Sequence, residues 1–311
     1  MKATPEISII APVYNEIESL EAFHKEISRV MTKSKLTWEL VLVDDGSSDG
    51  STDLIRKLAK KDAHIRPVIF ARNFGHQIAV TAGMDYCRGK AAVVIDADLQ
   101  DPPAVILDLV KKWREGYQVV YAIRSEREGE SWFKRMTASL FYRIVYRITE
   151  IKIPLDSGDF RLLDRVVVDV MCSMPERHRF LRGMATWVGF KQVGLPYKRA
   201  ARYAGETKYP LRQMLKLAMN AVTSFSYFPL QMATYVGFFA AGVSILAIPV
   251  VIILRLTGSL QLIGQATTLV AVLFLGGVQL ISLGILGEYI GRIYDEVKGR
   301  PLYIVSEAPK E

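Results

Sequence analysis

The sequence predicts an α/β fold in which a mostly parallel sheet carries helices on both faces, with two membrane-spanning helices after it. Three observations support this prediction. Short apolar runs alternate with helical patterns over the first 116 residues, as in sheets whose parallel strands are connected by helices. Each apolar run ends in a polar turn. Further along the chain, residues Leu217 to Gly287 contain a single charged residue, Arg255.

The alternating pattern defines four strands and four helices. The predicted strands lie at residues 7–16, including the polar turn that ends the first one, and at 39–43, 66–71 and 91–95. The predicted helices lie at residues 18–33, 52–61, 77–87 and 104–116. The run at 91–95 is short, rich in β-branched residues and without polar positions, which is typical of a strand buried on both faces.

The carboxyl ends of these strands carry the chemistry. They meet at one edge of a parallel sheet, where open α/β sheets bind their ligands. We therefore expect one crevice lined by Tyr14, Asn15, Glu16, Asp44, Asp45, Asp96 and Asp98. Mg²⁺ and Mn²⁺ prefer carboxylate oxygens and share their coordination with substrate phosphates, which makes Asp98 and Asp96 candidate metal ligands. The alternative for Asp98 is a cap of the following helix.

Two common nucleotide motifs are absent from the sequence. Neither the glycine-rich dinucleotide fingerprint nor the phosphate-binding loop with its lysine is present. We therefore expect any phosphates to be held by a metal ion and by nearby cations.

Three segments in this order resemble the family-2 glycosyltransferases, which have the GT-A fold. They read PVYNE from Pro12, VDDGSSDGS from Val43 and DADLQDPP from Asp96. The resemblance implies a UDP-sugar donor, a nucleoside pocket formed by the first two segments and a divalent cation held by the third, chiefly through Asp98. The nucleotide-sugar residues it implies are Pro12, Tyr14, Asn15, Glu16, Asp44, Asp45, Asp96 and Gln100. One carboxylate of the Asp44-Asp45 turn is expected to accept the uracil N–H.

The uncharged stretch is long enough for two membrane spans, predicted at about residues 228–254 and 262–287 and joined near Gly258-Ser259. Pro249 is expected to kink the first span. The second span carries the small residues Gly276, Gly277, Gly284, Gly287 and Gly291. Small residues allow close helix packing, either between copies of the chain or within the hairpin.

The charges that flank the spans predict their orientation. Between Arg177 and Lys216 there are ten Lys or Arg residues and one acidic residue, Glu206. By the positive-inside rule, both termini of this multi-pass protein are expected in the cytoplasm. No signal peptide is recognised, and Cys87 and Cys172 suit a reducing compartment. The net charge of +8 follows from this bias, so nucleic-acid binding is not expected.

We divide the chain into a cytoplasmic catalytic domain at residues 1–210, the two spans within 228–290 and a cytoplasmic tail at 291–311. Residues 130–150 and 178–226 mix aromatic, apolar and cationic side chains, as helices at a membrane surface do. The alternative for both segments is ordinary packing against the sheet.

Two further segments extend the resemblance to the polyisoprenyl-phosphate glycosyltransferases, the bacterial undecaprenyl-phosphate glucosyltransferase group related to dolichyl-phosphate mannose synthase. They run from Leu155 to Leu162 and from Arg202 to Tyr209. The resemblance implies inverting transfer of a hexose, with glucose expected, from a UDP-sugar to undecaprenyl phosphate. Some members carry Gly-Trp where this chain has Gly264-Gln265, which leaves the sugar open. A mannose or modified-sugar transferase, a binding scaffold without turnover and a lipid-transporting device are the alternatives.

A lipid phosphate acceptor is already an anion, so it needs neighbouring cations more than a general base. Guanidinium and ammonium groups meet that need, and the candidates are Arg124, Arg127, Arg202 and Lys208. Asp156 is the first candidate for a carboxylate beside the anomeric carbon and Asp159 is the second. The alternatives are a capped turn for Asp156 to Asp159 and a solvated loop around Lys208. His76 lies near the nucleotide edge, and we expect it to be structural.

Overall fold

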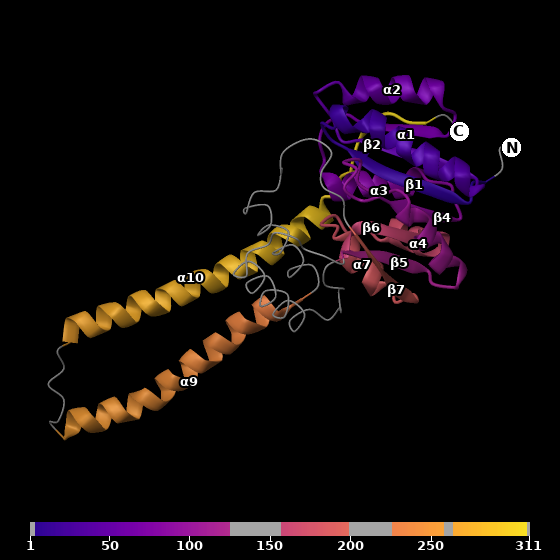
Figure 1. Ribbon diagram of the computed structural model, residues 1–311. Coiled ribbons are helices and arrows are strands. Elements are labelled where there is room, and N and C mark those ends of the chain that lie inside the picture. Colours follow the sequence, from indigo (N-terminus) through magenta and orange to yellow (C-terminus); the bar gives the residue numbers. More distant parts are fainter. Residues whose placement is uncertain (1–3, 125–156, 199–225, 258–263, 310–311) are drawn as a thin grey trace.

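The computed structural model describes residues 4–124, 157–198, 226–257 and 264–309. Its centre is an eight-stranded sheet in the order β7-β5-β6-β4-β1-β2-β3-β8 (Figure 1). The strands are β1 (Ile7–Val13), β2 (Trp38–Asp44), β3 (Ile65–Phe70), β4 (Ala91–Val94), β5 (Val119–Arg124), β6 (Ser157–Asp164), β7 (Gln192–Tyr197) and β8 (Val305–Glu307). The four predicted strands are confirmed as the parallel set β1 to β4.

Strand direction determines which residues meet. Strands β5 and β7 are parallel to each other, and β6 runs antiparallel between β4 and β5. The ends of β1, β2, β3, β4, β5 and β7 therefore share one edge with the start of β6. This carboxyl edge of the sheet brings Arg124, Asp159 and Tyr197 towards the predicted crevice, although they lie far apart in the sequence.

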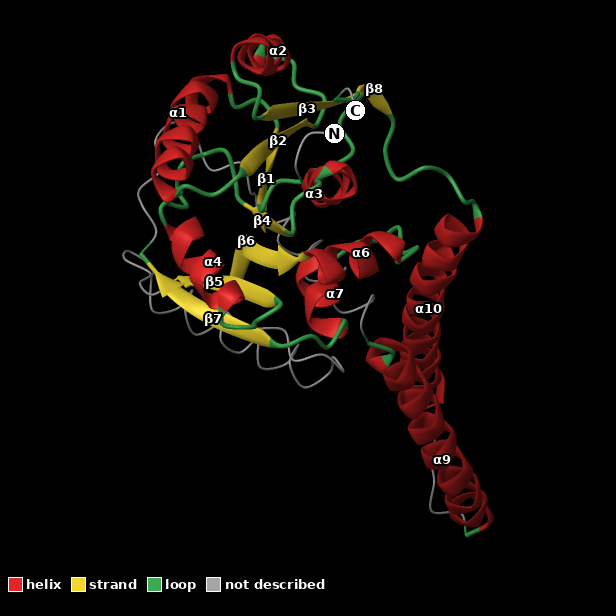
Figure 2. Cartoon of the chain, turned by 90° about the vertical axis from the view of Figure 1, so that its right-hand side faces the viewer, coloured by secondary structure: helices red, strands yellow, loops and turns green. Residues whose placement is uncertain are grey.

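Helices cover both faces of the sheet, as predicted (Figure 2). Helices α1 (Ile17–Ser34), α2 (Ser51–Lys61) and α4 (Val105–Arg114) contribute to one core, and α3 (His76–Tyr86), α6 (Arg165–Ser173) and α7 (Leu181–Trp187) contribute to the other. Along β2, Leu40 and Leu42 belong to the first core while Val41 and Val43 belong to the second. This alternation follows from the two-residue repeat of a strand and explains why the strand sequences are apolar throughout.

Part of the segment predicted as membrane-interfacial lies within this fold. In residues 178–226, helix α7 buries Leu181, Met184 and Ala185, and β7 pairs with β5. For residues 181–197 the alternative of ordinary packing against the sheet therefore holds. The buried apolar residues of α7 belong to the second core, and those of β7 pack against the first. Residues 130–150 lie outside the described part of the chain.

The two apolar helices form a hairpin that extends away from the sheet (Figures 1 and 2). They are α9 (Phe228–Leu256), which continues through Pro249, and α10 (Gly264–Val297). Both contain a stretch long and apolar enough to cross a membrane, Phe228–Val250 and Val270–Val297. At the end nearest the sheet, the Tyr289 hydroxyl donates a hydrogen bond to the Ser226 carbonyl at 2.7 Å.

The glycines of α10 do not mediate packing within the described hairpin. A Cβ atom added at Gly276, Gly277, Gly284, Gly287 or Gly291 would meet nothing within 4 Å among the described residues. Oligomerisation through these glycines stays a prediction.

The residues after α10 were predicted only as a tail. In the structure they return to the sheet. Strand β8 pairs antiparallel with β3, and the Ala71 N–H donates to the Ile304 carbonyl at 2.9 Å. The Tyr303 ring stacks on Phe70 at 5.1 Å, and its hydroxyl donates to Asp85 at 2.7 Å. The hairpin is therefore inserted between two parts of one sheet.

Candidate active site at the carboxyl edge of the sheet

Two turns form the first wall of the site, and each hydrogen-bonds to the other. After β1, Asn15 adopts a left-handed conformation with φ 54°, which asparagine tolerates better than most residues. Its Oδ1 accepts the Ser48 N–H at 2.8 Å, and its N–H donates to Ser47 Oγ at 3.0 Å. The Glu16 N–H donates to Ser51 Oγ at 3.1 Å. The polar residues of PVYNE and VDDGSSDGS thus fix the shape of these turns, while Tyr14 stays exposed.

Asp44 and Asp45 are buried beneath these turns, and their carboxylates stabilise them by hydrogen bonds. Asp44 accepts from the Ser47 N–H at 3.0 Å and from the Thr52 hydroxyl. Asp45 accepts from the N–H groups of Phe74 and Gly75 and from the Asn73 amide, which ties the turn after β2 to the turn after β3. Burial raises the pKa of Asp45 although these N–H bonds oppose the shift.

Gly46 is required where these turns meet. Its φ is +70°, and a Cβ at this position would lie 2.5 Å from the Arg72 carbonyl carbon. Any side chain here would be strained and would push the two turns apart.

The turn after β4 presents the paired carboxylates. Asp98 is buried, and its Oδ1 accepts the Gln100 N–H at 3.0 Å. Leu99 has φ 59°, a strained conformation for a leucine and of the kind that clusters at functional sites. The Asp96 side chain is 35% exposed, so it can reach a ligand. Behind the turn, buried Asp101 accepts a hydrogen bond from the Tyr197 hydroxyl.

Asp159 is the centre of an ion cluster beside this turn. Its Oδ1 accepts from Arg182 Nε at 2.7 Å, and His76 Nε2 lies 3.2 Å from its Oδ2. Gln77 links the cluster to α7, because its Nε2 donates to Asp159 at 3.4 Å while its Oε1 accepts the Leu181 N–H at 3.0 Å. His76 Nε2 also lies 3.9 Å from Asp96 Oδ1, so one imidazole faces both carboxylates.

Burial and the surrounding charges together shift the pKa values of Asp96 and Asp159 in opposite directions. Burial raises the pKa of Asp96 to about 6, because His76 offsets the effect only in part and the carboxylates of Asp159, Asp101 and Asp98 add to it. Burial acts in the same direction on Asp159, but Arg182 and His76 outweigh it and hold the Asp159 pKa well below its usual range. Burial opposes the charge of His76, yet the same two carboxylates raise its pKa to about 9. Asp96 is therefore the carboxylate whose charge is compensated only in part, by His76, within the described cluster.

Arg124 lies on the far side of the same edge, at the end of β5. A Cβ atom at Gly158 would lie only 3.2 Å from Arg124 Nη2. The glycine therefore leaves room for the Arg124 guanidinium. Buried Arg161 donates to the Gly158 carbonyl at 3.0 Å, and burial lowers its pKa to about 10. Arg124 is the one predicted acceptor-phosphate residue within the described part of the chain.

The described structure brings most predicted site residues to one edge. These are Pro12, Tyr14, Asn15, Glu16, Asp44, Asp45, Asp96, Asp98, Gln100, Arg124 and Asp159. Asp156, Arg127, Arg202 and Lys208 lie outside the described residues. Sequence reasoning missed Arg182, Gln77 and Tyr197, because they stand in ordinary helix and strand patterns. It expected His76 to be structural, whereas the structure places it between two site carboxylates.

The donor set of the site fits a divalent cation that shares its ligands with a substrate. Among the described residues, no group of three or more His, Cys, Asp and Glu side chains is arranged to hold a metal ion. Asp96 and Asp98 supply two carboxylates on one turn, and hard cations in phosphate chemistry commonly bind one or two carboxylates together with substrate oxygens. The excess negative charge around Asp96 is what such a cation would compensate.

The fold and this site define a membrane-associated glycosyltransferase, with a carboxylate-rich crevice on an α/β sheet and an apolar hairpin attached to it. The family model for glycosyl transferase family 2 matches residues 8–171, and the model described as the GtrB C-terminal hairpin matches residues 228–293. The chain belongs to glycosyl transferase family 2, and the resemblance seen in its sequence is confirmed.

Relatives match nearly the whole chain. An uncharacterized glycosyltransferase, YkcC of Bacillus subtilis, is 49% identical over 97% of this chain and 93% of its own length. The bactoprenol glucosyl transferase of Shigella phage SfII is 43% identical over 97% of this chain and 98% of its own length. Among solved structures, glucosyl-3-phosphoglycerate synthase from Mycobacterium tuberculosis, in complex with Mn²⁺, UDP-glucose and phosphoglyceric acid, is similar with a TM-score of 0.48 and 22% identity. That alignment covers 71% of this chain and 79% of the synthase.

Proposed function

We propose that this protein transfers glucose from UDP-glucose to a polyprenyl phosphate, with inversion at the anomeric carbon, on the cytoplasmic face of the plasma membrane. One structural observation carries the proposal: the Asp96–Asp98 crevice lies on the sheet edge to which residues 298–304 connect the membrane helix α10. A soluble donor and a lipid acceptor can meet only at such a junction. The near full-length similarity to bactoprenol glucosyl transferases supports the choice of sugar and lipid.

The donor would bind along the first two turns, with its diphosphate towards Asp96 and Asp98. These two carboxylates would hold Mg²⁺ or Mn²⁺, which neutralises charge on the departing diphosphate when bound. The wall formed by Asn15, Asp44 and Asp45 is already bonded internally, so it offers the nucleoside a rigid pocket. Contact between a carboxylate of the Asp44-Asp45 turn and uracil stays a prediction.

The acceptor reaction needs cations more than a base. A phosphate oxygen of the lipid forms a bond to the anomeric carbon while the bond from that carbon to the UDP oxygen breaks on the opposite side. We assign Arg124 to the acceptor phosphate, because guanidinium groups pair with phosphate oxygens in a fixed geometry. Arg127, Arg202 and Lys208 are the further candidates for this role.

Within the cluster we assign Asp159 to positioning. Its carboxylate is already paired with Arg182 and His76, and its low pKa makes it a poor proton acceptor. Asp156 therefore remains the candidate for the carboxylate beside the anomeric carbon. A conservative Asp159→Asn replacement should disturb the Arg182 and His76 positions without removing a reacting group.

The proposal is tested by sugar transfer into lipid. Membranes that contain the protein and added undecaprenyl phosphate are supplied in turn with radiolabelled UDP-glucose, UDP-galactose and GDP-mannose, with and without EDTA. The expected result is EDTA-sensitive label in the organic extract from UDP-glucose. Label from another donor alone would refute glucose and keep the reaction class, whereas donor binding without any lipid label would favour a scaffold.

A further inference from the structure

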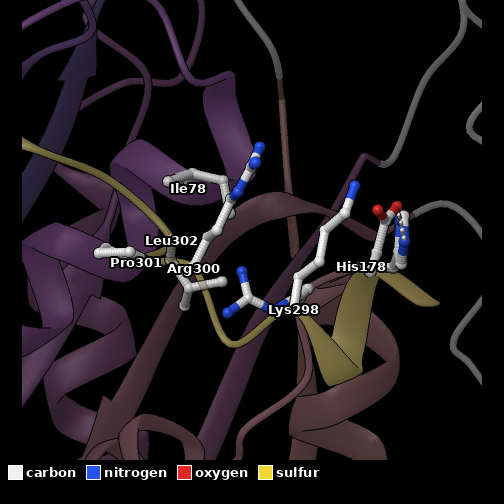
Figure 3. A pocket seen from close by; sticks show the side chains of 8 residues that line it. Ile78, His178, Lys298, Arg300, Pro301 and Leu302 are labelled. Atoms are coloured by element: carbon white, nitrogen blue, oxygen red, sulfur yellow. Dashed lines mark ion pairs between the residues drawn. The ribbon is translucent and has the colours of Figure 1, made fainter. Parts of the chain in front are cut away.

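A second site lies outside the crevice, where α10 leaves the membrane hairpin. An open pocket of about 240 Å³ is lined by the first turn of α3, the segment before α7, the last turn of α10 and the residues that follow it (Figure 3). Its lining residues are Ile78, Arg177, His178, Asp295, Lys298, Arg300, Pro301 and Leu302. No residue of the candidate active site is among them.

The charge of this pocket is positive. Arg177, Lys298 and Arg300 face one carboxylate, Asp295, and that carboxylate lies 3.2 Å from His178 Nε2. The Lys298 ammonium lies 4.1 Å from the centre of the Tyr294 ring, a contact that does not neutralise its charge. Neither Lys298 nor Arg300 forms an ion pair within the described parts of the chain. Such a set of cations attracts a phosphate group.

Helix α3 separates the pocket from the crevice. His76 faces Asp96 and Asp159, whereas Ile78 lines the pocket. Residues two positions apart on an α-helix point about 200° apart, so the two side chains are on opposite sides of α3. The acceptor phosphate that reacts near Asp96 would therefore not occupy this pocket.

The end of α10 places the pocket at a lipid surface. Ile290, Ile293, Tyr294 and Val297 recur at helical spacing and are 61–79% exposed. On the other side, the Glu296 carboxylate accepts the Arg177 N–H at 2.8 Å, and Asp295 meets His178. This amphipathic end is typical of a helix that lies at a membrane boundary, and Lys298 and Arg300 follow it directly.

We propose that this pocket binds the headgroup phosphate of an acidic phospholipid in the leaflet on the catalytic side. The phosphate would lie between Arg177, Lys298 and Arg300 while its acyl chains lie along the apolar side of α10. Basic residues beside a membrane helix are attracted to anionic lipid, and a shaped pocket adds a specific contact to that attraction. This inference is independent of the proposed sugar transfer, because it concerns lipid binding alone.

The test is lipid retention by the full-length protein. Detergent-solubilised protein is titrated with phosphatidylglycerol or phosphatidylcholine, and bound lipid is counted by native mass spectrometry. The variant is Lys298→Gln together with Arg300→Gln. The control, Lys60→Gln together with Lys61→Gln, makes the same change of charge on α2, which lies away from the hairpin (Figure 1). Both variants are first checked for an unchanged melting temperature.

We expect the wild type and the control to retain phosphatidylglycerol at least about threefold better than phosphatidylcholine, and the pocket variant to lose this preference. An unchanged preference in the pocket variant would overturn the proposal. Displacement of phosphatidylglycerol by millimolar inorganic phosphate would identify a free-anion site instead. Retention of undecaprenyl phosphate but not of phosphatidylglycerol would assign the pocket to the acceptor, again against the proposal.

Discussion

The carboxylates of the crevice differ in what their oxygens accept, and this difference assigns their roles. Asp44 and Asp45 accept from the turns around them and stabilise a wall. Asp159 is neutralised by Arg182 and His76. Asp96 is partly exposed and its charge is compensated only in part, by His76, and Asp98 lies two residues further along the same strained turn. We therefore expect a ligand with positive charge to bind at Asp96 and Asp98.

Replacing Asp98 by asparagine tests the metal assignment. We expect Asp98→Asn to lower sugar transfer by at least about a hundredfold, the scale of loss when one group that stabilises developing charge is removed. The measurement is initial rate against Mg²⁺ and Mn²⁺ concentration. Asp108→Asn, an exposed position on α4, serves as the control and should be unchanged. Near-normal rates for Asp98→Asn would remove it from the metal site.

Glu39 lies at the opposite edge of the sheet, and we expect its replacement to affect stability alone. Its buried carboxylate accepts from Ser8 Oγ at 2.6 Å and from the Arg88 guanidinium at 2.9 Å. The largely buried Arg66 guanidinium also lies 3.5 Å from this carboxylate, and it would be left uncompensated, so Glu39→Gln should cost about 3 kcal/mol of unfolding free energy. Urea unfolding followed by tryptophan fluorescence measures it.

The control for this prediction is Glu26→Gln, which breaks an exposed pair with Arg29 and should cost less than about 1 kcal/mol. Equal losses in the two variants would contradict a buried network. UDP binding should stay the same in both, because neither residue is near the crevice.

At the scale of single residues, the sequence predicted Asp44, Asp45, Asp96 and Asp98 because they lie at the ends of apolar strands, and it predicted Asp159 from the segment that carries the family resemblance. It could not predict their partners. Arg182 meets Asp159, 23 positions earlier in the chain, only because β6 runs antiparallel and α7 packs against α3 through Gln77. Long-range partners of this kind follow from topology, and a motif does not record them.

At the scale of elements, strand β8 connects the membrane helix to the donor pocket. Tyr303 stacks on Phe70, and the Phe70 ring packs edge-on against Phe74, whose N–H donates to Asp45. A continuous chain of contacts thus links the segment after α10 to the turn behind the predicted nucleoside wall. The parallel strands were predictable from their apolar runs. Strand β8 was not, because three residues carry no measurable periodicity.

Tyr303 tests this connection. We expect Tyr303→Ala to lower the unfolding free energy by about 2 kcal/mol and to weaken UDP binding severalfold, since both the ring stack and the hydrogen bond to Asp85 are lost. Isothermal titration with UDP measures the second effect. Tyr303→Phe keeps the stack and should bind UDP almost normally. Normal UDP affinity in Tyr303→Ala would show that β8 does not influence the pocket.

At the scale of the whole molecule, the apolar hairpin is joined to the sheet at both of its ends. Residues at the start of α9 and at the end of α10 both lie near the sheet, and Tyr289 links them through Ser226. The sequence predicted the two spans from their composition. The predicted second span ends near Gly287, because the residues after it carry charges. The helix itself continues to Val297, and its last turns are amphipathic with the charges on one side.

Orientation in the membrane gives a direct test at this scale. In a variant with Cys87 and Cys172 replaced by alanine, single cysteines are placed at Ser259 and at Glu311. A membrane-impermeant maleimide added to intact cells should label the cysteine at 259 alone, and labelling at 311 should require permeabilised cells. Labelling at 311 in intact cells would reverse the predicted orientation.

The return of the chain from α10 to the sheet has a consequence for synthesis. Strand β8 is translated after both apolar helices, so the edge of β3 cannot be covered until the whole hairpin has been synthesised. Until then β3 presents unpaired backbone groups, which invite association with other chains. The sheet is therefore completed only after the hairpin has been synthesised, and a chain cut short within the hairpin would leave this sheet edge open.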